Sequence, residues 1–133
     1  MAIDAVRRYA AALRHIRSRL FDAYPEFRDI RDLMTAVRHT RTLPREGTSS
    51  TGVEYSIHGA GCRMTDEQGR EVDVDLVDGV EAFDAWRIGF FLDDEGSDAR
   101  LSDEELFAAC AHLAGTGELA EVRPGRWYAL PEA

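Results

Sequence analysis

The sequence predicts an α+β fold, with two N-terminal helices, an antiparallel β-hairpin, two further helices and a C-terminal β-hairpin around one core. Three observations support this prediction. Apolar residues recur at helical spacing over residues 2–39, they alternate with polar residues in two segments between 53 and 77, and a helix-start signal precedes a turn signal after residue 101. The chain has 133 residues, 44% of them hydrophobic. This length allows one core and no second independent one, so residues 1–133 are expected to form a single domain.

Two amphipathic helices open the chain. Between residues 2 and 21, steps of three and four separate the apolar residues Val6, Tyr9, Leu13, Ile16 and Leu20. Pro25 ends this helix because its ring removes a hydrogen-bond donor. The spacing then resumes and predicts a second helix that ends near His39. Core packing is the expected role of both stripes, and a homodimer through these helices stays an open alternative.

The next part of the chain predicts a loop and a hairpin. Residues 40–52 are rich in Ser, Thr, Gly and Pro, which predicts a loop. Alternating apolar residues around Tyr55 and around Val74 then predict two antiparallel strands. A turn centred between Glu67 and Gln68 would pair Cys62 with Asp73.

This register divides the hairpin into two faces. Gly59 and Gly61 would lie on the apolar face, where an aromatic helix carrying Phe83 and Trp86 could approach the backbone closely. The polar face is expected to collect a histidine, a thiol and two carboxylates, namely His58, Cys62, Asp73 and Asp75.

The last third of the chain predicts two helices and a hairpin. Residues 81–92 fit a helix with Phe83, Trp86 and Phe90 on one face. Ser102 precedes Glu105 by three residues, which is the signature of a capping box that opens a helix. Pro124-Gly125 then separates two apolar segments and predicts a terminal hairpin with a loop of three to five residues.

The polar face of the first hairpin has three interpretations. A small enzyme could use His58 as base, Cys62 as nucleophile and Asp73 or Asp75 to orient the imidazole, and a metal could use the same four side chains. Residues four apart on a strand are about 13 Å apart, however, and neighbouring carboxylates raise a thiol pKa. A structural role is therefore favoured, with no catalytic residue, metal or cofactor expected.

Charge is distributed unevenly along the chain. The net charge is 16 − 25 = −9, and residues 66–105 contain 15 acidic residues and 3 arginines. Such a segment repels phosphate, which excludes general nucleic-acid binding there and favours a protein partner with a basic surface. The residues expected to bind it are Asp93, Asp94, Glu95, Asp98 and the aromatic Trp127. No signal peptide or bilayer-spanning segment is evident, so no membrane association and a cytoplasmic location are expected.

Three segments carry a family resemblance: His58-Gly59-Ala60-Gly61-Cys62, Val72-Asp73-Val74-Asp75-Leu76 and Phe83-Asp84-Ala85-Trp86-Arg87. The chain resembles a family of small bacterial proteins classed as a domain of unknown function, in which an HGxGC segment, a Val-Asp strand and an FDxWR segment occur in this order. The resemblance implies shared structural motif residues, which are Gly59, Gly61, Phe83, Trp86 and Arg87. It implies no activity.

By analogy, small acidic bacterial domains of this type look like the immunity partners of secreted toxins. The expected function is therefore a non-enzymatic binding protein, an immunity or adaptor module that docks a basic partner protein. The alternative is a small enzyme or metal-binding protein that uses the face of His58, Cys62, Asp73 and Asp75.

Overall fold

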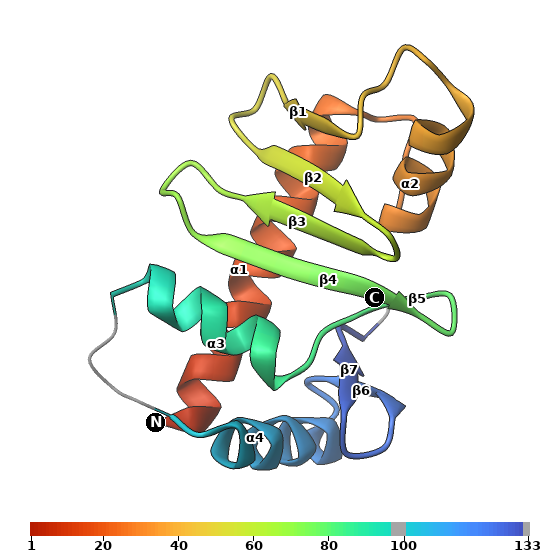
Figure 1. Ribbon diagram of the computed structural model, residues 1–133. Helices are drawn as coiled ribbons and strands as arrows, with labels where there is room; N and C mark the ends of the chain where they lie inside the picture. The colour runs from red at the N-terminus through yellow and green to blue at the C-terminus, as the bar shows by residue number, and fades with distance from the viewer. Residues whose placement is uncertain (97–100, 132–133) are drawn as a thin grey trace.

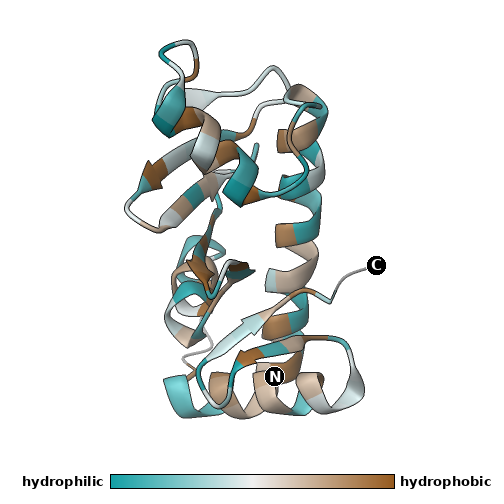
Figure 2. Ribbon diagram, turned by 90° about the vertical axis from the view of Figure 1, so that its right-hand side faces the viewer, coloured by the Kyte–Doolittle hydropathy of each residue, from teal (hydrophilic) through white to brown (hydrophobic). Residues whose placement is uncertain are grey.

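The computed structural model describes residues 1–96 and 101–131 and confirms the α+β class (Figure 1). Helices α1 and α2 precede a five-stranded antiparallel sheet, helices α3 and α4 follow it, and a separate two-stranded hairpin ends the chain. The bounds are α1 Ala2–Ala23, α2 Ile30–His39, β1 Glu46–Thr48, β2 Glu54–His58, β3 Gly61–Thr65, β4 Glu71–Val77, β5 Val80–Ala82, α3 Ala85–Asp94, α4 Asp103–Thr116, β6 Ala120–Arg123 and β7 Trp127–Ala129. Viewed from the side, the sheet and α1 form separate layers (Figure 2).

Both N-terminal helices form where the apolar spacing predicts them. The stripe of α1 from Val6 to Leu20 is buried, and α2 buries Ile30, Leu33, Met34 and Val37. Asp29 caps α2 by accepting a hydrogen bond from the backbone N–H of Asp32. The two stripes pack into one core with the buried face of the sheet.

The sheet contains more strands than the predicted hairpin. Its order is β1-β2-β3-β4-β5, with every pair antiparallel. The segment 53–62, predicted as one strand, folds back on itself between β2 and β3, where Gly59 has a positive φ of 58°. A second tight turn at Asp78-Gly79, with positive φ at both residues, adds β5. Strand β1 lies within the segment predicted as a loop.

The predicted register between the two strands was wrong by one residue. Cys62 pairs with Val74, and Asp73 pairs with Arg63. The reason is the turn, whose loop holds three residues and ends at Gly69 with φ of 81°. A one-residue shift exchanges faces, so Cys62 points into the core and is 1% exposed.

The predicted contact between the glycines and an aromatic helix was also wrong. A Cβ atom at Gly59 would meet nothing within 4 Å, and one at Gly61 would lie 3.0 Å from the Oδ1 of Asp75. Helix α3 begins only at Ala85, after β5, with Asp84 as its cap. Its buried residues are Ala85, Ile88, Phe91 and Leu92.

The C-terminal elements match their sequence signals. Ser102 and Glu105 form the capping box of α4, and Gly117 ends that helix in the left-handed conformation. Strands β6 and β7 pair across the three-residue loop 124–126. Phe83 and Tyr128 exchange backbone hydrogen bonds, which joins this hairpin to the segment between β5 and α3. Within the described ranges, no helix is both long and apolar enough to span a bilayer.

Candidate functional site

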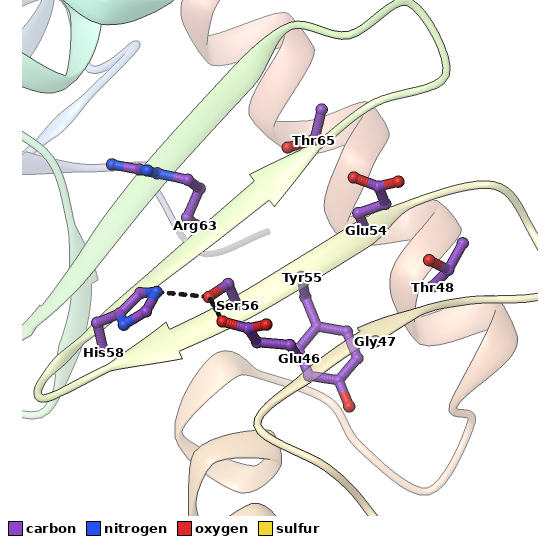
Figure 3. Close-up of a pocket in the computed structure, with 9 residues that line it drawn as sticks. All are labelled: Glu46, Gly47, Thr48, Glu54, Tyr55, Ser56, His58, Arg63 and Thr65. Atoms are coloured by element: carbon purple, nitrogen blue, oxygen red, sulfur yellow. Dashed lines mark hydrogen bonds between the residues drawn. The ribbon is translucent and has the colours of Figure 1, made fainter.

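A groove of about 540 Å³ lies on the outer face of β1, β2 and β3, opposite the face that packs in the core (Figure 3). Two of its side chains converge on the hydroxyl group of a third. The Oγ of Ser56 lies 3.3 Å from an Oε1 of Glu46 and within hydrogen-bond distance of the Nε2 of His58. The lining residues are Glu46, Gly47, Thr48, Glu54, Tyr55, Ser56, His58, Arg63 and Thr65.

The order of these three groups determines their chemistry. A nucleophilic serine needs an imidazole that accepts its proton, and the carboxylate orients the imidazole from its other side. Here the carboxylate of Glu46 contacts the hydroxyl of Ser56, and so does the imidazole of His58. Both Glu46 and His58 are exposed to solvent. These three described side chains therefore lack the serine–imidazole–carboxylate order of a catalytic triad, and the groove presents their hydrogen-bonding groups toward solvent.

The structure does not bring Cys62 together with His58. The thiol is buried in the core with Ile57 and Val74 as its cross-strand neighbours, whereas His58 lies on the outer face. Burial raises the pKa of the Cys62 thiol to about 12, with smaller contributions from Glu81 and Asp73. A neutral buried thiol is a poor nucleophile and a poor metal ligand.

The two carboxylates of the predicted polar face are each held by an arginine. Asp73 lies 3.3 Å from the Nε of Arg63, and Asp75 accepts a 2.9 Å hydrogen bond from the Nε of Arg87. Burial raises the pKa of Asp73 against the opposing effect of Arg63. The bond to Asp75 raises the pKa of Arg87. In the part of the chain that the structure describes, no three His, Cys, Asp or Glu side chains are grouped to hold a metal ion.

Several carboxylates of the acidic stretch are used within the molecule. Asp66 is buried and accepts a hydrogen bond from the Nε of Arg70, and Glu95 pairs with both Arg70 and Arg8. Asp94 accepts a 2.7 Å hydrogen bond from the backbone N–H of Glu71 at the edge of β4. Two of the expected binding residues, Asp94 and Glu95, therefore already have partners within the molecule.

Of the remaining predicted binding residues, Asp93 and Trp127 lie on different elements, α3 and β7. Asp93 is exposed near the C-terminal end of α3, and it makes no side-chain hydrogen bond or ion pair with any described residue. Asp98 lies outside the described residues. Trp127 is half-buried on β7, where the guanidinium of Arg126 lies 5.6 Å from the centre of its ring.

Helix α3 presents an aromatic surface, and it includes Trp86, which was expected to pack against the glycines of the first hairpin. Trp86 is 63% exposed and Phe90 is 44% exposed. Together with Gly89 and Asp93 they follow the steps of three and four that define one face of a helix. We call Trp86, Gly89, Phe90 and Asp93 the α3 outer face. The sequence carries a signal that could have identified this face. A second set of apolar residues, including Ile88 and Phe91, follows helical spacing on another side of the helix, and this set is the buried one.

Comparison with known proteins identifies a family whose function is unknown. No curated protein and no solved structure matches the chain significantly. One family model matches nearly the whole sequence, including the HGxGC, Val-Asp and FDxWR segments. The chain belongs to the family described as Domain of unknown function (DUF6896), whose model matches residues 2–129.

Proposed function

We propose that the protein is a non-enzymatic binding protein that docks a basic partner protein on the α3 outer face. The observation that supports this proposal is the exposure of Trp86 and Phe90, which lie one helical turn apart. Exposed aromatic side chains on a folded surface mark interaction sites, and tryptophan is among the residues that contribute most to binding free energy.

The charge of the molecule favours a basic partner. The chain carries a net charge of −9, and Asp93 contributes a carboxylate at one end of the aromatic pair. Arginine side chains of a partner could stack on the exposed rings through cation–π interactions and pair with this carboxylate. A surface of this composition is better suited to an arginine-rich protein than to nucleic acid.

The proposed mode of action requires no reaction at this protein. An immunity or adaptor module acts by occupying the functional surface of its partner, so its specificity depends on the contact face alone. The buried Cys62 thiol and the paired Asp73 and Asp75 carboxylates support this reading over the enzymatic one, because the proposed catalytic groups are not available together.

The test is affinity capture from cells of the source organism, followed by binding measurements with each captured protein after purification. The double variant Trp86→Ala, Phe90→Ala is compared with Trp127→Ala, which removes an aromatic side chain from another surface. The proposal predicts that a basic protein binds the wild type and the Trp127→Ala variant and that the double variant loses at least about tenfold in affinity.

Asp93→Asn provides the electrostatic arm of the same experiment. It should slow association modestly, and added salt should reduce the difference from wild type because it screens exposed charges. Equal binding by the wild type and the double variant would refute the α3 outer face as the docking site. Loss of binding only in Trp127→Ala would place the contact on the C-terminal hairpin instead.

A further inference from the structure

A second cavity lies on another part of the molecule, between α1, the start of α2, the β4–β5 turn and the C-terminal segment after β7. Its volume is about 440 Å³, within the range of small-molecule binding sites. We call it the α1–α2 pocket. Its lining residues are Leu13, Arg14, Arg17, Asp29, Arg31, Gly79, Val80, Glu81, Leu130 and Pro131.

The two carboxylates of this pocket are already engaged. Glu81 lies 2.7 Å from the Nε of Arg17 and accepts a 2.7 Å hydrogen bond from the backbone N–H of Ile30. Asp29 accepts the capping hydrogen bond of α2 from Asp32. These contacts neutralise one of the three arginines and fix both acidic groups in structural roles.

The other two arginines keep positive charge available at the pocket. Arg31 forms a long ion pair with Asp29, with 4.0 Å between its Nη2 and the Oδ2 of Asp29, and its side chain is 60% exposed. Arg14 is exposed and forms no ion pair with any residue that the structure describes. The lining holds three arginines and two carboxylates, so the pocket keeps a net positive charge in a protein whose net charge is −9 and offers a local site for a negative charge.

The rest of the lining is apolar. Leu13 is buried in the middle of the α1 stripe, Leu130 is half-buried, and Val80, the first residue of β5, is 42% exposed. Val80 is one of the few large apolar side chains that are exposed in the part of the chain that the structure describes. A ligand that covered Val80 would remove its apolar surface from water. An apolar lining beside two guanidinium groups matches a molecule with one charged end.

We propose that the α1–α2 pocket binds a small organic anion, with its carboxylate group between Arg14 and Arg31 and an apolar body against Leu13, Val80 and Leu130. This site is separate from the α3 outer face and does not depend on the docking of a partner protein. The class of ligand is a monocarboxylate with an aliphatic or aromatic tail.

The test uses octanoate as the probe and follows the backbone amide resonances of the intact protein by NMR. Saturable shifts are expected at Val80, Gly79 and Leu13, with a Kd on the order of 1 mM or below. Octylamine and 1-octanol have the same tail with a positive or a neutral head group. Both should bind at least about fivefold more weakly than octanoate. Octylamine carries the same charge as the arginines, and the neutral hydroxyl of 1-octanol can accept a hydrogen bond but cannot form an ion pair with them.

Matched variants locate the binding site. Arg14→Gln and Arg31→Gln should each weaken octanoate binding about fivefold, whereas Arg45→Gln, which removes the same charge from an exposed residue before β1, should leave it unchanged. Val80→Glu places a carboxylate at the pocket and should abolish binding. The proposal would be overturned if octanoate failed to saturate, if octanol bound equally well, or if all three arginine variants behaved alike.

Discussion

Two fully buried tyrosines should respond differently when the hydroxyl group is removed. Tyr9 and Tyr128 are both 0% exposed. The Tyr9 hydroxyl donates a hydrogen bond to the backbone carbonyl of Asp73. The β3–β4 register directs that carbonyl away from β3, and β5 reaches along β4 only as far as Asp75, so Tyr9 satisfies an open edge of the sheet. The Tyr128 hydroxyl is buried and has no hydrogen-bond partner among the described residues.

The expected change for Tyr9→Phe follows from this geometry. The ring itself can keep its contacts with Phe83 and Phe91, at centroid distances of 4.8 and 5.6 Å, so only the hydrogen bond is lost. Leaving the Asp73 carbonyl buried without a donor costs about 1–3 kcal/mol of unfolding free energy. Tyr128→Phe removes an unsatisfied polar atom and should change the stability by less than about 0.5 kcal/mol or increase it.

Urea denaturation followed by circular dichroism measures both changes. With a slope of about 2 kcal/mol per molar, the midpoint of Tyr9→Phe should fall by about 0.5–1.5 M, and its melting temperature should fall by several degrees. The midpoint of Tyr128→Phe should stay within about 0.25 M of the wild type. Equal losses in both variants, or no loss in Tyr9→Phe, would refute the proposed role of Tyr9 at the β4 edge.

Two further predictions use other matched pairs. Asp94→Ala should reduce the unfolding free energy by about 0.5–1.5 kcal/mol, because Asp94 accepts a hydrogen bond from the backbone N–H of Glu71. The control variant Asp93→Ala should stay within about 0.5 kcal/mol of wild type. Equal effects of the two variants in chemical denaturation would contradict the contact of Asp94 with the edge of β4. Burial raises the pKa of both Cys62 and Cys110 to about 12, above the value of about 8.5 for an unfolded thiol. Between these two pKa values the unfolded chain can ionise its thiols, whereas the folded protein cannot. The free energy of unfolding is therefore fully retained below about pH 8.5 and falls as the pH rises toward 12. Neither thiol should react with a disulfide reagent at pH 8 in the native protein, and both should react in urea; rapid native labelling of Cys62 would contradict its burial.

The helices could be predicted because their signals are local. The capping box of Ser102 and Glu105 and the stop at Pro25 act through neighbouring backbone groups, so the spacing of residues is enough to locate them. The sheet depends on pairing instead. Strand β1 has only three residues and exists because it pairs with β2, and nothing in its own sequence distinguishes it from a loop.

The face assignment of Cys62 failed because one turn residue decides it. The loop 67–69 has three residues with a left-handed Gly69, and the Asp66 side chain accepts hydrogen bonds from the backbone N–H groups of Gln68 and Arg70. A two-residue loop would have placed Cys62 beside Asp73 on the outer face. The turn geometry therefore places the Cys62 thiol in the core and not on the predicted site, although the alternation of apolar and polar residues in the strands was predicted correctly.

Charge counting along the chain has a similar weakness, because ion pairs form between segments that are distant in sequence. Arg8 and Arg17 of α1 reach Glu95 and Glu81, and Arg123 of β6 reaches Asp78. Residues 1–50 contain ten arginines and six acidic residues, and the ion pairs of Arg8 and Arg17 partly neutralise the acidic stretch 66–105. A docking surface cannot be inferred from the number of acidic residues in a segment, since many of them stabilise the fold. The α3 outer face is a stronger candidate because Trp86 and Phe90 have no comparable internal role while they remain exposed to water.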